Sequence, residues 1–92
     1  MSEPDPFMRQ IREAISDNDR TLVDAVNKRL ELVARLKAYK EAQGIDFLDP
    51  EREEWMLSYL QRANLGPLTP EGLNEFYIQV LALTKREVNE RR

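Results

Sequence analysis

A long stretch without helix breakers constrains this chain more than any other feature. No glycine and no proline occurs from Phe7 to Gln43, a run of 37 residues. A continuous helix of that length would extend over about 55 Å, whereas a compact domain of 92 residues has a radius of gyration of only roughly 12 Å. One chain cannot cover such a helix alone, so we expect either a kink or a second copy packed along it.

The composition narrows the chemistry that the chain can perform. Cysteine and histidine are both missing, which excludes disulfides and thiolate metal sites and removes the commonest general base and metal ligand. We therefore expect no metal and no cofactor. The net charge of −3 argues against nucleic acid as a partner. The N-terminus lacks a signal-peptide pattern, and no apolar run is long enough to span a membrane, so we predict a cytoplasmic protein.

The same helix-start signal occurs three times along the chain. A residue that can cap a helix precedes a proline suited to the first helical position. These pairs are Asp5-Pro6, Asp49-Pro50 and Thr69-Pro70. Gly44 is expected to end the first helix, the Asn64–Pro67 segment to end the second, and the third to fray over its charged end, Glu87–Arg92. Residues 1–92 are thus predicted to form a single all-α domain with one long and two shorter helices.

Apolar residues recur along each predicted helix at the steps typical of an amphipathic helix, and they are most simply core. In the first helix they are Ile11, Ile15, Leu22, Val26, Leu30, Val33 and Leu36. In the second they are Trp55, Met56, Tyr59 and Leu60, and in the third Leu73, Phe76, Tyr77, Val80, Leu81 and Leu83. We call the set in the first helix the apolar stripe.

Cations lie beside the apolar stripe of the first helix. Arg29 and Lys40 are eleven positions apart, so they project from nearly the same face, about 16 Å apart along the axis. They could converge on an anion, or they could belong to a solvated face with ion pairs such as Lys37–Glu41. Arg12 lies about 25 Å before Arg29. It could reach the same ligand only from the second chain of an antiparallel dimer, which would create two symmetric shared sites.

The polar and apolar residues together form a pattern that covers almost the whole chain. Its segments are Ile11-Arg12-Glu13-Ala14-Ile15, Asp19, Asn27-Lys28-Arg29-Leu30-Glu31-Leu32, Lys37-Ala38-Tyr39-Lys40 and Asp49-Pro50-Glu51-Arg52-Glu53. In this order and spacing they resemble the small all-helical chorismate mutases of the shikimate pathway. The resemblance implies an intertwined homodimer with two shared active sites that converts chorismate, a dicarboxylate, to prephenate. This pericyclic reaction needs no nucleophile, metal or cofactor.

The resemblance also implies roles for the matching polar residues. The implied substrate-binding residues are Arg12, Arg29, Lys40, Asp49, Arg52, Glu53, Thr84 and Glu87, and those implied to be catalytic are Lys40, Glu87 and Arg29. Arg12 of one chain and Arg29 of the other would hold the two carboxylates, and Lys40 would donate to the ether oxygen. Arg52 would add positive charge, and Glu53 would accept a hydrogen bond from the ring hydroxyl.

The third helix departs from the family pattern, in which a glutamine near the helix end donates to the ether oxygen and a hydroxyl residue stands one turn earlier. One alignment places Glu87 and Leu83 at these positions, and another places Val88 and Thr84 there. We favour Glu87, with Thr84 on a neighbouring part of the face, because valine cannot donate. A glutamate donates only when protonated, so we expect higher activity at acidic pH. The alternative is a solvated Glu87 that pairs with Arg91.

Two other functions are compatible with much of the same sequence. An isochorismate pyruvate lyase on the same scaffold would also need cations around a dicarboxylate. A dimeric helical interaction module without catalysis would account for the long helix and the charged surface. It would not explain why Arg12, Arg29, Lys40 and Arg52 all match the pattern.

Overall fold

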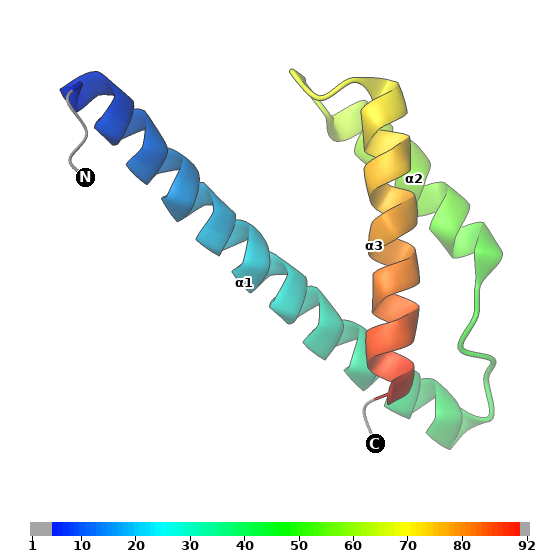
Figure 1. Ribbon diagram of the computed structural model, residues 1–92. Helices are drawn as coiled ribbons and strands as arrows, with labels where there is room; N and C mark the ends of the chain where they lie inside the picture. The colour runs from blue at the N-terminus through cyan, green and yellow to red at the C-terminus, as the bar shows by residue number, and fades with distance from the viewer. Residues whose placement is uncertain (1–4, 91–92) are drawn as a thin grey trace. The chain divides into compact units, whose positions relative to one another are not determined.

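The structure, a computed structural model, describes residues 5–90, and these contain three helices and no strand. Helix α1 spans Pro6–Gln43, α2 spans Pro50–Ala63 and α3 spans Pro70–Glu90 (Figure 1). The prediction of an all-α chain with one long and two shorter helices is confirmed. The chain divides into two compact units. Of the described residues, 5–32 form the N-terminal unit and 33–90 form the C-terminal unit, so α1 contributes to both.

All three predicted helix-start signals act as caps. In each case an oxygen of the capping side chain accepts a hydrogen bond from a backbone N–H of the first turn, which the helix itself cannot satisfy. The bonds are Phe7 N to Asp5 Oδ1 at 2.9 Å, Arg52 N to Asp49 Oδ1 at 3.1 Å, and Gly72 N to Thr69 Oγ1 at 2.9 Å. Each proline follows its cap directly, so local chemistry alone places the three helix starts.

Helix α1 ends where the sequence predicts, at a glycine with left-handed backbone geometry. Gly44 has φ of 72°, a conformation that costs a residue with a Cβ atom but not glycine. The reversal lets the Ile45 backbone N–H donate to the Lys40 carbonyl at 2.8 Å, which satisfies a carbonyl that the helix end leaves open. The turn is therefore hydrogen-bonded to the backbone of Lys40, one of the predicted catalytic cations.

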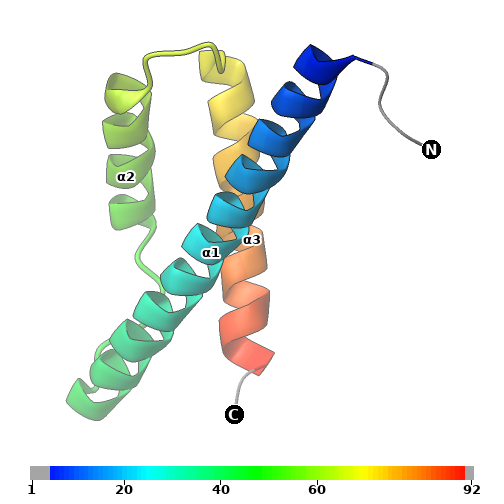
Figure 2. The same cartoon turned by 90° about the vertical axis from the view of Figure 1, so that its left-hand side faces the viewer.

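The N-terminal unit is a single run of helix, drawn from blue to cyan in Figure 2. No residue of α1 is buried, and Ile15 and Leu22 of the apolar stripe are 54% and 48% exposed. An amphipathic helix gains its stability mainly by burying such a stripe, and this unit offers nothing to bury it against. Within residues 5–90, no helix is both long enough and apolar enough to cross a membrane.

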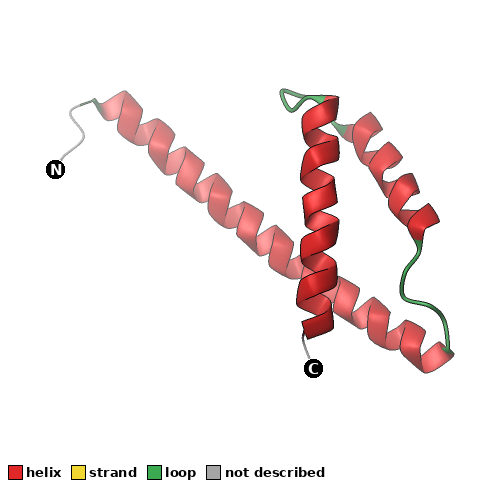
Figure 3. Ribbon diagram, turned by 45° about the vertical axis from the view of Figure 1, so that its right-hand side comes forward, coloured by secondary structure: helices red, strands yellow, loops and turns green. Residues whose placement is uncertain are grey.

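The C-terminal unit has a small core of its own on one face of α3. Leu73, Tyr77, Thr84 and Val88 are buried, and their spacing of four, seven and four residues keeps them on one side of the helix. Helices α2 and α3 contact each other and are joined by a short loop (Figure 3). Near that loop, Gln61 Nε2 donates to the Pro70 carbonyl oxygen at 2.9 Å.

The predicted fraying of the third helix is wrong for residues 87–90, because α3 continues to Glu90. Val88 is only 2% exposed, and the Asn89 Oδ1 atom accepts a hydrogen bond from Lys37 Nζ at 3.0 Å. The Lys37–Asn89 hydrogen bond joins the last turn of α3 to the C-terminal part of α1, a contact that the charges of the segment alone did not reveal. The rest of the predicted frayed segment, residues 91–92, lies outside the described residues.

Candidate functional site

The predicted site residues divide between the two units of the chain. Arg12 and Arg29 belong to the N-terminal unit. Those of the C-terminal unit are Lys40, Asp49, Arg52, Glu53, Thr84 and Glu87. The second group includes all of the predicted acids and the predicted catalytic cation Lys40. Its residues come from α1, α2, α3 and the loop before α2, all within one unit.

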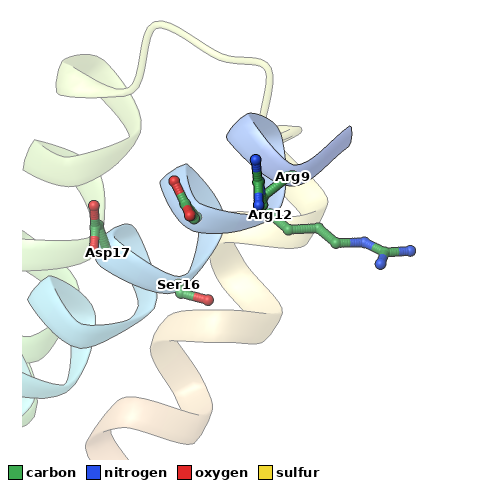
Figure 4. A pocket seen from close by; sticks show the side chains of 5 residues that line it. Arg9, Arg12, Ser16 and Asp17 are labelled. Carbon is green, nitrogen blue, oxygen red and sulfur yellow. The ribbon is translucent and has the colours of Figure 1, made fainter. Parts of the chain in front are cut away.

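In the N-terminal unit, Arg12 lines an open hollow on the surface of α1 (Figure 4). Arg9, Glu13, Ser16 and Asp17 line the same hollow, and Figure 4 shows the Arg9, Ser16 and Asp17 side chains projecting from successive turns of α1. Arg9 is a second cation one turn before Arg12 that the sequence pattern did not single out. Because acids share the hollow with the two arginines, its charge alone does not identify an anion site.

Lys40 is half-buried at the C-terminal end of α1. Its Nζ atom donates to the carbonyl oxygen of Phe47 at 3.3 Å, in the loop that the Gly44 turn folds back. An ammonium group carries three donors, so this one bond orients Lys40 and leaves capacity for a ligand oxygen.

The first turn of α2 holds three predicted site residues side by side. Asp49 acts as the N-cap, as predicted, so its side chain is engaged with the Arg52 backbone. The Arg52 guanidinium lies over the ring of Trp55, with Cζ 4.3 Å from the centroid, a favourable cation–π geometry. The Trp55 ring in turn stacks on Tyr59 at 5.4 Å and an interplanar angle of 4°. Arg52 therefore lies over the first of two exposed, stacked aromatic rings along α2, Trp55 and Tyr59, which the sequence pattern predicted as core residues.

Glu53 connects the first turn of α2 to α3. Its Oε2 atom forms an ion pair with Lys85 Nζ at 3.2 Å, and both side chains are partly exposed. The sequence pattern did not single out Lys85, because no local spacing links it to a residue on another helix. Within residues 5–90, no group of three or more acidic side chains is arranged to hold a metal ion.

On α3, the two alternative alignments place their residues in different environments. Thr84 and Val88 belong to the buried face, and the Thr84 hydroxyl donates to the Val80 carbonyl oxygen at 2.7 Å. Glu87 is partly exposed and lies 3.6 Å from the Arg86 guanidinium. The assignment of Glu87 to the site stays a prediction, and its alternative partner, Arg91, lies outside the described residues.

Comparison with known proteins identifies the family to which this arrangement belongs. The sequence profile described as chorismate mutase type II matches residues 11–88. The chain belongs to the type II chorismate mutase family. The resemblance predicted from the sequence is thereby confirmed.

Individual chorismate mutases support this assignment. The bifunctional chorismate mutase/prephenate dehydratase of Stutzerimonas stutzeri is 30% identical over 87 residues, which cover 89% of this chain but only 24% of that protein. This chain thus spans about a quarter of the length of that curated relative. Two structures of chorismate mutase from Thermus thermophilus share the fold. Form II has a TM-score of 0.85 at 23% sequence identity and covers 91% of this chain and 96% of its own. Form I has a TM-score of 0.81 at 25% sequence identity and covers 84% of this chain and 96% of its own.

Proposed function

We propose that this chain acts as a chorismate mutase, an isomerase that converts chorismate to prephenate, and that it does so as a homodimer. The observation that carries the proposal is the family match over residues 11–88, which includes every residue predicted to bind substrate. The boundaries of a single domain over residues 1–92 and the cytoplasmic location stay predictions.

The proposed dimer accounts for the exposed apolar stripe of the N-terminal unit. Burial of one large aliphatic side chain contributes about 1.5–3 kcal/mol, and Ile11, Ile15 and Leu22 are all about half exposed. A second copy that covers them would stabilise a helix that has no neighbour within its own unit. A closed two-fold dimer repeats each contact and would therefore contain two equivalent sites.

In the proposed site, arginines hold the substrate in its reactive shape. Chorismate is flexible, and its rearrangement requires a compact conformation in which the carbon atoms to be joined lie close together. Arg29 of one chain and Arg12 of the other would bind the two carboxylates by charge-assisted hydrogen bonds. Fixing both ends of the molecule lowers the entropic part of the barrier before any bond changes.

The reaction itself asks the protein for electrostatic stabilisation and not for proton transfer. One carbon–oxygen bond breaks as one carbon–carbon bond forms within the same molecule, and negative charge develops on the ether oxygen. Lys40, oriented by its bond to Phe47, would donate to that oxygen as the charge grows. Glu87, with Thr84 nearby, is the proposed contribution of α3.

The first turn of α2 would bind the remaining polar parts of the substrate. Arg52 would add positive charge beside the substrate, which carries two negative charges. Glu53 would accept a hydrogen bond from the ring hydroxyl, since a carboxylate has several acceptor positions and the ion pair with Lys85 occupies only part of them. The backbone near Asp49, which the cap holds in place, would contribute as well.

The test is to add chorismate to the purified chain and follow its disappearance by absorbance. Arg29→Ala is expected to lower kcat/KM by about 10²–10³-fold, the usual effect of removing one group that stabilises the transition state. Arg35→Ala removes an exposed arginine of the same helix and serves as the matched control. A non-catalytic interaction module would show no turnover, and equal Arg29→Ala and Arg35→Ala kinetics would remove Arg29 from the site.

A parallel assay with isochorismate separates the proposed mutase from a lyase on the same scaffold. The mutase is expected to consume chorismate and to release no pyruvate from isochorismate. Preferential release of pyruvate would replace the proposed reaction by the lyase reaction, with the same cations in use.

A further inference from the structure

The ion pair between Glu53 and Lys85 joins α2 and α3 at the edge of the proposed site. The Lys85 Nζ and Glu53 Oε2 atoms are 3.2 Å apart, and the two side chains are 42% and 32% exposed. Such a partly exposed pair contributes little to the stability of a fold, because solvent screens the attraction between the charges. The position of the pair therefore indicates its role better than its contribution to stability does.

Lys85 differs from its charged neighbours on α3 in what it contacts. Arg86 and Glu87 are neighbours on α3 and pair with each other at 3.6 Å. Lys85 instead reaches another helix and meets a residue that is proposed to bind substrate. It also directly follows Thr84, a buried residue of the core face.

We propose that Lys85 is a positioning residue that holds the Glu53 carboxylate in place and balances its charge when the substrate binds. This inference rests on the proposed function, in which Glu53 accepts a hydrogen bond from the ring hydroxyl. A carboxylate beside a doubly anionic substrate repels it, and a lysine ammonium at ion-pair distance offsets that repulsion. The same contact restricts a flexible glutamate side chain before substrate arrives, which lowers the ordering cost of binding.

The proposal predicts a change in binding with little change in the chemical step. Lys85→Met keeps the length of the side chain and removes its charge, so KM for chorismate should rise about 5–10-fold, as expected for loss of one charge-assisted contact. The turnover number kcat should change less than about twofold, since Lys85 does not touch the reacting atoms. Lys85→Arg, which keeps the charge, should restore most of the affinity.

A double-mutant cycle shows whether Lys85 acts through Glu53. Glu53→Gln removes the negative charge that Lys85 balances. Adding Lys85→Met to Glu53→Gln should therefore change KM less than about twofold, because coupled residues give non-additive effects.

Lys37→Met is the matched control, since Lys37 also bridges to α3, through Asn89. Its Nζ atom also lies 5.8 Å from the centroid of the Phe47 ring, whereas Lys40 bonds to the backbone carbonyl of Phe47. Lys37→Met should leave KM unchanged.

The outcomes separate this inference from the function on which it rests. Absence of chorismate turnover by the unmodified chain would overturn the proposed function and with it the role of Lys85. Normal turnover with an unchanged KM for Lys85→Met would overturn the role of Lys85 alone. So would a Lys85→Met effect that is equal in the presence and absence of Glu53→Gln, or one that Lys37→Met reproduces.

Discussion

The N-terminal and C-terminal units are built from helices of the same amphipathic kind, yet only one of them has a core. On α3, Leu73 and Val88 are buried, and α3 contacts α2 within the same unit. On the N-terminal part of α1, Ile15 and Leu22 repeat the same periodicity and remain about half exposed. An apolar stripe indicates that a helix face needs covering, but the pattern does not say which surface covers it.

The two units also differ in the chemistry they carry. The N-terminal unit contributes the cations Arg12 and Arg29, and the C-terminal unit contributes Lys40 together with the acids Asp49 and Glu53. Under the proposed function, neither set is complete by itself for binding and rearranging a dicarboxylate. Under the proposed function, the unit without a core supplies carboxylate-binding groups to the unit that has one, and the same association would complete both the fold and the site.

The largest effect is expected from placing a charge in the exposed apolar stripe. Leu22→Asp should abolish the dimer and with it nearly all activity, because it removes about 1.5–3 kcal/mol of burial per chain and adds a charge to the interface. Light scattering should show a mass near 10.8 kDa instead of twice that value, and far-ultraviolet circular dichroism should show loss of helix.

The control for this prediction is the same acid on the opposite side of the helix. Arg20→Asp lies about 200° around the axis from Leu22, and Arg20 is also exposed. It should leave the mass and the circular dichroism unchanged. A Leu22→Asp chain that stays dimeric and active would mean that this stripe is not the dimer interface.

An intermediate effect is expected from mixing two inactive variants. Arg12→Ala and Lys40→Ala should each show very low activity alone. If Arg12 of one chain serves the site that contains Lys40 of the other, each mixed dimer has one intact site. Random mixing, by refolding the two variants together, should then recover about a quarter of the wild-type activity, measured as chorismate consumption per total protein.

The mixing experiment distinguishes shared sites from sites within one chain. Where one chain supplies both Arg12 and Lys40 to a site, every site in the mixture keeps one substitution and no recovery occurs. Mixing either variant with itself under the same refolding conditions provides the baseline.

The smallest effect is expected in the core of the C-terminal unit. Val88→Ala removes two buried carbon atoms and should lower the free energy of unfolding by about 1–2 kcal/mol. Urea unfolding measures it, at a fixed protein concentration because dimer stability depends on concentration. Ile78 of α3 is 52% exposed, so Ile78→Ala should lower the free energy of unfolding by less than Val88→Ala does, although it removes more atoms. The reverse order would show that another surface covers Ile78.

Part of the core could be predicted from the sequence, and part could not. Leu73 and Tyr77 were expected from the apolar periodicity and are buried, whereas Phe76 was expected as well and is 47% exposed. Thr84 and Val88 complete the buried face, but the sequence pattern predicted Thr84 as a substrate-binding residue and placed Val88 in the charged segment expected to fray. The apolar periodicity predicts which side of a helix is buried, but it does not distinguish between two adjacent residues such as Phe76 and Tyr77. The packing of the helices decides which of the two is covered.

The sequence by itself determined the three helix starts and the end of α1, because capping oxygens, prolines and Gly44 act on backbone groups only a few residues away. It also determined the family, through cations and acids at fixed spacing. Only the tertiary structure decided that Lys85 meets Glu53 and that Lys37 holds the last turn of α3. Those contacts join residues on different helices, and their partners follow from how the helices pack and not from any local pattern.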